Sequence, residues 1–292
     1  TERNCAGGPT PWGSWLSCEE STARANGGVR GQDHGYVFEV PAALDTLAAA
    51  IPLKAMGRFN HEAAAVDPRS GIVYLTEDRP DGLLYRFVPR TPGRLAEGGQ
   101  LEVLVLSDSR SADTRNWGAK AGTVKPGEKL AVRWLALSDV EAPDDDLRQR
   151  GHAAGAALFA RGEGLWWGQG ELYFSCTTGG AQQAGQVFRY RPSRRDGGRL
   201  ELFVESGDKS LFANADNLTV TPWGDLLVCE DTTRGCALVG IRPDGSLYRL
   251  AANPYNGSEL AGVCLSPDGR TVFLNIQCSG LTLAITGPFP AA

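Results

Sequence analysis

Acidic residues recur beside short hydrophobic stretches, and one of these acidic groups includes a cysteine. Three such stretches end in Cys18-Glu19-Glu20, Glu77-Asp78 and Glu230-Asp231. Others begin at Glu62, Glu163, Asp216-Asn217 and Glu259. Carboxylates suit hard cations such as Ca²⁺ and ferric ions, whereas a thiolate suits a transition metal better than calcium. If the fold brings these residues together, they would form a site for metals of both kinds.

An internal repeat indicates how these residues could meet. The segments TPWGSWLSCEE (10–20) and TPWGDLLVCED (221–231) share a turn, a hydrophobic strand and a Cys-Glu-acid ending. Weaker copies are DPRSGIVYLTED (67–78), WGQGELYFSCT (167–177) and SPDGRTVFLNIQ (266–277). Each copy joins a Pro/Gly turn to a strand rich in β-branched and aromatic residues.

Each copy is expected to lie within a group of four antiparallel strands. A following strand is expected at 35–40, 83–88, 186–191, 236–241 and 281–286. A further strand is expected at 52–59, 101–106, 200–205 and 246–251. Opening strands are expected at 61–66, 163–167, 217–220 and 259–265. This all-β pattern predicts a β-propeller of five or six four-stranded antiparallel blades, forming a single domain over 1–292. The first group lacks a clear opening strand and the last lacks a fourth, so we expect these two groups to complete each other.

The longest interruption of the repeat covers residues 107–150. Residues 107–128 are polar and glycine-rich, a strand is expected at 129–137, and 144–160 has helical character. Long inserts of this kind are usually functional or disordered. A lid over the propeller channel, a solvated excursion and a hidden sixth blade are the alternatives for this insert.

The propeller hypothesis places the acidic residues around one axis. The first strand of each blade lines the channel, and its start lies beside the end of the antiparallel strand that follows. Carboxylates gathered in this way raise one another's pKa. Since Arg161 and His61 are the only basic residues beside these strand ends, multivalent cations are the expected counter-charge. Taken singly, each acid could equally be a solvent-exposed charge at a strand end.

Composition excludes several functions. The net charge is −5 and no basic stripe occurs, so a nucleic-acid partner is not expected. No apolar run of about 18 residues exists, so we expect no membrane span. Seven cysteines cannot all pair within one chain. With three histidines and no G-x-S-x-G elbow, no Ser-His-Asp arrangement is evident.

Five segments together resemble the PhoX family of alkaline phosphatases. They are NCAGGPTPWGSWLSCEES (4–21), GRFNHEAA (57–64), ARGEG (160–164), DNLTVTPWGDLLVCED (216–231) and ELAGVCLSPDGRTVFLNIQ (259–277). The resemblance implies a periplasmic or secreted propeller phosphatase with iron and calcium in its channel. The twin-arginine segment usual in exported members does not occur in these 292 residues.

The resemblance also implies a set of metal ligands and a phosphate clamp. Cys18 is the implied thiolate ligand, and Glu62, Glu163 and Glu259 are the leading carboxylates. Second candidates are Glu19, Glu77, Asn217, Glu230 and Asp231, without a division between iron and calcium. Arg161 would share a strand face with Glu163 and bind phosphate through both arms of its guanidinium, unless it forms a salt bridge to a neighbouring Glu.

The expected activity is therefore metal-dependent hydrolysis of phosphate monoesters by a monomeric chain. His61 would act as a general acid, support a ligand or serve a structural hydrogen bond. A calcium-dependent lactonase-type or esterase-type propeller is one alternative, but it gives Cys18 no role. A non-catalytic propeller that binds calcium for stability is the other. Metal content and a comparison of phosphate ester with lactone substrates separate these alternatives.

Overall fold

The computed structural model describes residues 1–118, 123–193, 196–233 and 235–290. These residues form two compact units: unit 1 covers Thr1–Thr114, Leu130–Gly162 and Pro192–Arg199, and unit 2 covers Arg115–Lys129, Glu163–Arg191 and Leu200–Ala292. Nearly all regular structure in both units is β-strand, which confirms the all-β prediction. The single-domain prediction stays a prediction.

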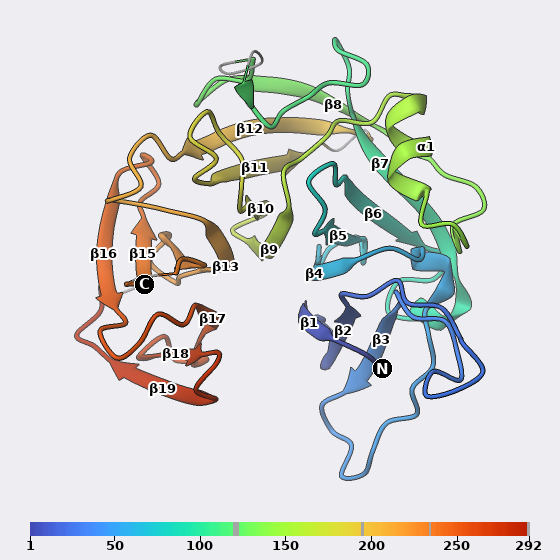
Figure 1. Cartoon of the computed structure of the whole chain (residues 1–292), viewed down its shortest axis with the longest axis horizontal. Coiled ribbons are helices and arrows are strands. Elements are labelled where there is room, and N and C mark those ends of the chain that lie inside the picture. Colours follow the sequence, from blue (N-terminus) through green and yellow to red (C-terminus); the bar gives the residue numbers. More distant parts are fainter. Residues whose placement is uncertain (119–122, 194–195, 234, 291–292) are drawn as a thin grey trace. The chain divides into compact units, whose positions relative to one another are not determined.

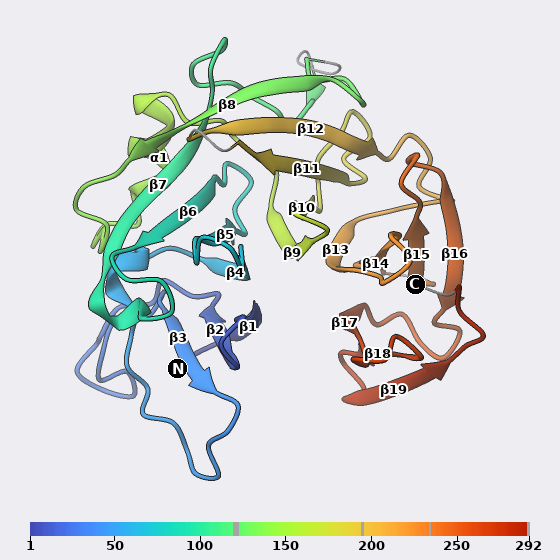
Figure 2. The ribbon, with the colours of Figure 1, turned by 180° about the vertical axis from the view of Figure 1, so that it is seen from behind.

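Unit 1 contains two antiparallel sheets joined through their opening strands (Figure 1). The first sheet is β1 (Asn4–Pro9), β2 (Ser14–Glu19) and β3 (Val37–Pro41). The second is β4 (His61–Val66), β5 (Val73–Glu77), β6 (Leu84–Pro89), β7 (Gly99–Leu106) and β8 (Lys129–Ala136). β1 pairs in parallel with β4 through Gly7 and Ala63, and the two strands lie side by side in both views (Figure 2). A hydrophobic cluster lies inside this unit, with Leu16, Phe59, Leu75, Tyr85 and Val103 among its buried members.

Unit 2 carries three antiparallel sheets, each in simple sequential strand order. They are β9 (Gly162–Gly168), β10 (Glu171–Cys176), β11 (Gln186–Pro192) and β12 (Gly198–Glu205); β13 (Ala215–Val220), β14 (Leu226–Glu230), β15 (Ala237–Ile241) and β16 (Leu247–Ala252); and β17 (Leu260–Leu265), β18 (Thr271–Ile276) and β19 (Leu281–Thr286). Among the residues described, the last sheet thus has three strands, as the repeat predicts.

The prediction that the first sheet lacks an opening strand is wrong. Strand β1 supplies it, although its sequence NCAGGP holds two glycines and no β-branched residue. Gly7 has a φ of 61°, and a Cβ at Gly8 would lie 1.8 Å from the carbonyl oxygen of Ala64. The close approach of β1 to β4 therefore requires residues that local strand propensity disfavours.

The prediction of a strand at 52–59 is also wrong. This segment contains one bridge, between Pro52 and Phe38, followed by the 3-10 helix η1 (Lys54–Met56). Leu53, Met56 and Phe59 all enter the core of unit 1. Their spacing of three residues fits a 3-10 turn rather than the alternation of a strand.

The insert at 107–150 supplies an extra strand to unit 1. β8 pairs antiparallel with β7, with Glu102 opposite Ala136 and Leu106 opposite Val132. β8 therefore extends the second sheet, and the hidden sixth blade stays a prediction. The expected helix is present but shorter, as α1 (Leu147–Ala154). Outside the insert, η2 (Leu95–Glu97) is a short 3-10 helix. Residues 119–122 of the insert lie outside the described residues, and the lid role stays a prediction.

The cysteines and the helices add two further observations. Cys176 and Cys229 are buried and Cys264 is half-buried, and all seven cysteines carry free thiols. In the part of the chain that the structure describes, no helix is long and apolar enough to cross a membrane.

Candidate functional site

The register of the sheets defines one equivalent position in each opening strand. The first residue of the opening strand pairs with the end of the next strand as Asn4 with Glu19, His61 with Glu77, Ala215 with Glu230 and Leu260 with Ile276. The following residue is therefore structurally equivalent from sheet to sheet. It is Cys5 in β1, Glu62 in β4, Asp216 in β13 and Ala261 in β17, and Glu163 is second in β9.

In unit 1 this position gathers a group of potential metal ligands. Atoms of Cys5, Glu20 and Glu62 that could bind a metal all lie within 4.8 Å of one another. Glu62 is buried, and the other two are half-buried. Burial, reinforced by the neighbouring charge of Glu62, raises the pKa of the Cys5 thiol. Asn60 donates a hydrogen bond of 3.3 Å to Glu20 and so fixes one of its carboxylate oxygens.

Cys18 lies directly opposite Cys5 in the β1–β2 ladder. Its side chain is fully buried within the hydrophobic core of unit 1. Burial is the main cause that raises its pKa, and the charge of Glu62 adds to it. Cys5 occupies the repeat position of Glu62, and Cys18 does not. The role of Cys18 as the thiolate ligand stays a prediction.

The first acid of each acidic doublet faces a loop of its own sheet. Glu19, Glu77 and Glu230 accept hydrogen bonds from the backbone N–H groups of Gly35 and Tyr36, of Leu83, and of Ala213 and Ala237 respectively. Glu77 also accepts a bond from the Tyr85 hydroxyl at 2.8 Å. Backbone bonding of this kind anchors the loops that precede or follow these strands.

Burial perturbs two of these anchoring carboxyls. It raises the pKa of Glu77 to about 7 against the opposing hydrogen bond from Tyr85 and the charge of Arg148. It also raises the pKa of Glu230, although backbone hydrogen bonds oppose the shift. A cation that bound Glu77 or Glu230 would have to displace these hydrogen-bond donors first.

The second acid of each doublet in unit 1 binds an arginine. Arg161 donates to both carboxylate oxygens of Asp78, from Nε at 2.8 Å and from Nη2 at 3.0 Å. Arg3 donates from Nη2 to Glu20 at 2.8 Å. Because neighbouring strand residues point to opposite faces, the second acid points away from the loop that the first one anchors. The salt bridge considered for Arg161 is thus formed, with Asp78 as its partner.

In unit 2, Glu163 and Asp216 bring carboxylate oxygens within 4.8 Å of each other. Asn217 donates its amide to Asp216 at 3.3 Å and accepts a hydrogen bond from the backbone of Gly262. Two other predicted ligands have different surroundings. Glu259 lies next to β17 and its charge acts on the buried Cys229, whereas the backbone N–H of Asp231 binds the carbonyl of Asn214.

His61 has a structural environment. Its ring is fully buried, stacks on Phe59 at a centroid distance of 3.6 Å and lies 3.1 Å from the carbonyl oxygen of Gly57. Burial lowers its pKa to about 3. A neutral, core-facing imidazole of this kind supports the structural hydrogen bond rather than general acid chemistry.

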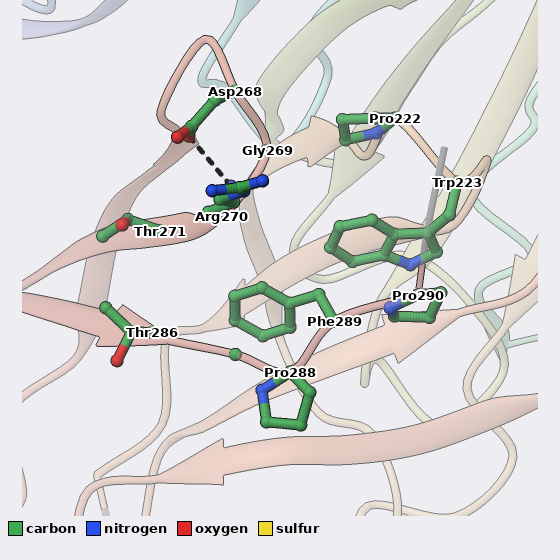
Figure 3. A pocket seen from close by; sticks show the side chains of 11 residues that line it. Pro222, Trp223, Asp268, Gly269, Arg270, Thr271, Thr286, Pro288, Phe289 and Pro290 are labelled. Atoms are coloured by element: carbon green, nitrogen blue, oxygen red, sulfur yellow. Dashed lines mark hydrogen bonds between the residues drawn. The ribbon is translucent and has the colours of Figure 1, made fainter.

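A separate cavity of about 600 Å³ lies within unit 2 (Figure 3). Trp223 and Phe289 stack there at a centroid distance of 5.5 Å, and Asp268 and Arg270 line the same cavity. None of the predicted metal ligands lines it. The acidic groups and this cavity are therefore different features of the molecule.

The structure places three further residues in these groups of potential ligands that the sequence prediction does not select, namely Cys5, Glu20 and Asp216. The signal for Asp216 is present in the sequence, because the residue after the start of the opening strand recurs as Glu62, Glu163 and Asp216. It was hidden at Cys5 because β1 was not recognised as a strand. Glu20 was passed over in favour of Glu19, since the sequence does not show which acid of a doublet faces the loop.

The fold and the site together define a class of protein: an all-β protein that carries carboxylates and a thiol at equivalent strand positions. The sequence model of the alkaline phosphatase PhoX family matches residues 1–280. The chain therefore belongs to the PhoX family.

The other comparisons give distant similarities. No curated protein matches the sequence. Similar solved structures include virginiamycin B lyase from Staphylococcus aureus, at 12% identity over 98% of this chain and 71% of that chain, with a TM-score of 0.43. A gluconolactonase from Xanthomonas campestris has 15% identity over 90% of this chain and 65% of that chain, with a TM-score of 0.40. Regucalcin from Agrobacterium tumefaciens, described as a calcium-binding protein, has 15% identity over 80% of this chain and 56% of that chain, with a TM-score of 0.40.

Proposed function

We propose that this chain hydrolyses phosphate monoesters with bound iron and calcium, as an alkaline phosphatase of the PhoX type. The observation that carries the proposal is the grouping of Cys5, Glu20 and Glu62 within 4.8 Å in a member of this family. Two carboxylates and a thiol form a donor set that suits ferric iron. Family membership also supports small phosphate esters as substrates and a periplasmic or secreted location.

The repeat supports a wider ligand set. We propose that the antiparallel sheets are five or six blades of a β-propeller, because the same strand order and the same register recur from sheet to sheet. Glu163 and Asp216 hold the same strand position as Glu62, and their hard oxygen donors suit calcium. Asn217 and Glu259 remain candidates beside them. Cys18 remains a candidate thiolate on the strand next to Cys5.

The chain's own residues prepare this site for phosphate. Bound metal ions would supply the Lewis acidity that polarises the phosphoryl group. Arg161 would bind the phosphoryl oxygens, and Asp78 fixes its guanidinium before substrate arrives. Because the guanidinium is already ordered, little side-chain entropy is lost on binding. Asn60 holds Glu20 through a hydrogen bond and thereby orients a proposed ligand.

The first test compares metal content with substrate preference. The purified protein should contain iron and calcium, hydrolyse p-nitrophenyl phosphate, and lose this activity with EDTA. A lactone panel under the same conditions should give no turnover. A protein that contains no iron after iron is supplied, and that opens lactones but not the phosphate ester, would refute the proposal. Calcium without either activity would favour a non-catalytic scaffold.

Substitution of single cysteines tests the thiol ligand. Cys5→Ser should lose most of the iron and the phosphatase activity, because a hydroxyl is a weaker ligand than a thiolate. Cys278→Ser is the matched control, since Cys278 is an exposed free thiol. Cys18→Ala should keep iron if Cys5 is the ligand. Loss of iron only in Cys18→Ala would assign the metal to Cys18 instead.

A further inference from the structure

Arg3 and Arg161 occupy equivalent backbone positions. Arg3 immediately precedes β1, and Arg161 immediately precedes β9. Both adopt the left-handed conformation, with φ values of 47° and 55°, which is uncommon for residues other than glycine. Asn214 immediately precedes β13 and has the same conformation, with a φ of 52°. Three of the opening strands thus share one entry geometry, and two of these three entries carry arginine.

The two arginines also bind equivalent acids. Arg3 pairs with Glu20 and Arg161 pairs with Asp78, and each acid is the second member of its doublet. The charges of Asp78 and Cys5 both act on Arg3 in addition to its hydrogen bond with Glu20. Arg3 therefore lies at the edge of the Cys5, Glu20 and Glu62 group.

The guanidinium of Arg3 has more donor capacity left than that of Arg161. Arg3 makes one side-chain hydrogen bond within the described residues, from Nη2 to Glu20. Its side chain is 65% exposed, whereas that of Arg161 is 30% exposed and is bound by both oxygens of Asp78. The remaining N–H groups of Arg3 can reach an incoming anion, and a planar guanidinium matches the geometry of phosphate oxygens.

We propose that Arg3 is a second phosphate-binding arginine, which contacts the phosphoryl group from the side of the site opposite its ion pair with Glu20. This inference rests on the proposed phosphatase function. Cation binding by Glu20 would weaken its hold on Arg3 and leave the guanidinium available to the substrate dianion. Arg3 would then favour phosphate monoesters, which carry two negative charges, over less charged esters.

The experiment measures phosphate binding separately from catalysis. Arg3→Ala should raise the KM for p-nitrophenyl phosphate about tenfold, as expected for the loss of one charge-assisted hydrogen bond. The inhibition constant of inorganic phosphate should rise by a similar factor, and calorimetry on the metal-loaded protein should show the same weakening. Arg3→Lys, which keeps the charge but loses the planar fork, should fall between wild type and Arg3→Ala.

Arg94→Ala is the matched control, because Arg94 is 71% exposed and makes one hydrogen bond to a glutamate in unit 1. Its kinetic constants should equal those of wild type. Unchanged phosphate binding in Arg3→Ala would overturn the inference while leaving the phosphatase proposal intact. Loss of iron in Arg3→Ala would also overturn it, since Arg3 would then act by positioning Glu20. If wild type shows no phosphatase activity, the calorimetric comparison still decides whether Arg3 binds phosphate.

Discussion

Glu77 should make the stability of this protein depend on pH. Its carboxyl is fully buried, and Arg148 is the nearest cation, with Nη1 at 3.7 Å. Two effects compete, because burial disfavours the charged carboxylate whereas Arg148 and the hydroxyl of Tyr85 favour it. Burial is the larger effect and raises the pKa from 4.5 to about 7.

The sign and size of the effect follow from this shift. A carboxyl whose pKa is raised by folding binds more protons in the folded state, so its contribution to stability is complete below pH 4.5 and is lost as pH rises through 7. One pKa unit corresponds to about 1.4 kcal/mol, so the total loss is about 3 kcal/mol. Most of this loss, about 2 to 3 kcal/mol, falls between pH 5 and pH 8.

The assay is urea unfolding of wild type and Glu77→Gln at several pH values and a fixed metal concentration. Glutamine keeps an acceptor for Tyr85 and does not titrate. The stability of the variant relative to wild type should therefore rise by about 2 to 3 kcal/mol from pH 5 to pH 8. Glu141→Gln, at an exposed ion pair with Lys54, should show no comparable trend. A flat or falling difference for Glu77→Gln would mean that Arg148 outweighs burial, and the reasoning would fail.

Three further substitutions test the anchors and the strand contact. Glu19→Ala removes an acceptor of backbone and histidine hydrogen bonds and should lower the free energy of unfolding in urea by about 3 kcal/mol. Gly8→Ala would place Cβ 1.8 Å from the oxygen of Ala64, so this variant should lose most of its bound metal in elemental analysis. Gly31 has open space around it, so Gly31→Ala should keep its metal. His61 has a pKa lowered to about 3, so its contribution to stability should be lost as pH falls below about 6.5, and the stability of His61→Phe relative to wild type should rise toward acid pH in urea titrations.

The strands that follow each Pro/Gly turn could be predicted from the sequence because their pattern is local. Alternating and β-branched residues mark β5, β14 and β18, and the repeat brings the weaker copies into line. Strand β1 could not be found in this way. The close approach of β1 to the backbone of β4 requires glycine in β1. Glycine also lowers the strand propensity of the same segment, so the sequence pattern does not mark it as a strand.

That single omission explains why Cys5 is missing from the residues that the sequence selects. Once β1 is in place, the ladder puts Asn4 opposite Glu19, as it puts His61 opposite Glu77. Cys5 then falls in the position of Glu62, and Cys18 falls on the neighbouring strand with its side chain in the core. The register of the strands decides which side chains can lie together as ligands. This register can be assigned only when every opening strand is known.

The acidic doublets show a second limit of the sequence. Both acids of a doublet look alike in one dimension, but alternation along the strand gives them opposite faces. Glu19 and Glu77 bind backbone N–H groups of loops that exist only after the sheet has formed, whereas Glu20 and Asp78 bind arginines. In the sheet of β17, Ala261 stands at the position that Glu62 holds in β4, and Ile276 stands at the position that Glu77 holds in β5. The sheet of β9 separates the two features, because Glu163 is second in its opening strand while β10 ends in Cys176 rather than an acid. A loop-anchoring acid is therefore not required for a carboxylate at the equivalent position, so each acid has to be placed by the register of its own sheet.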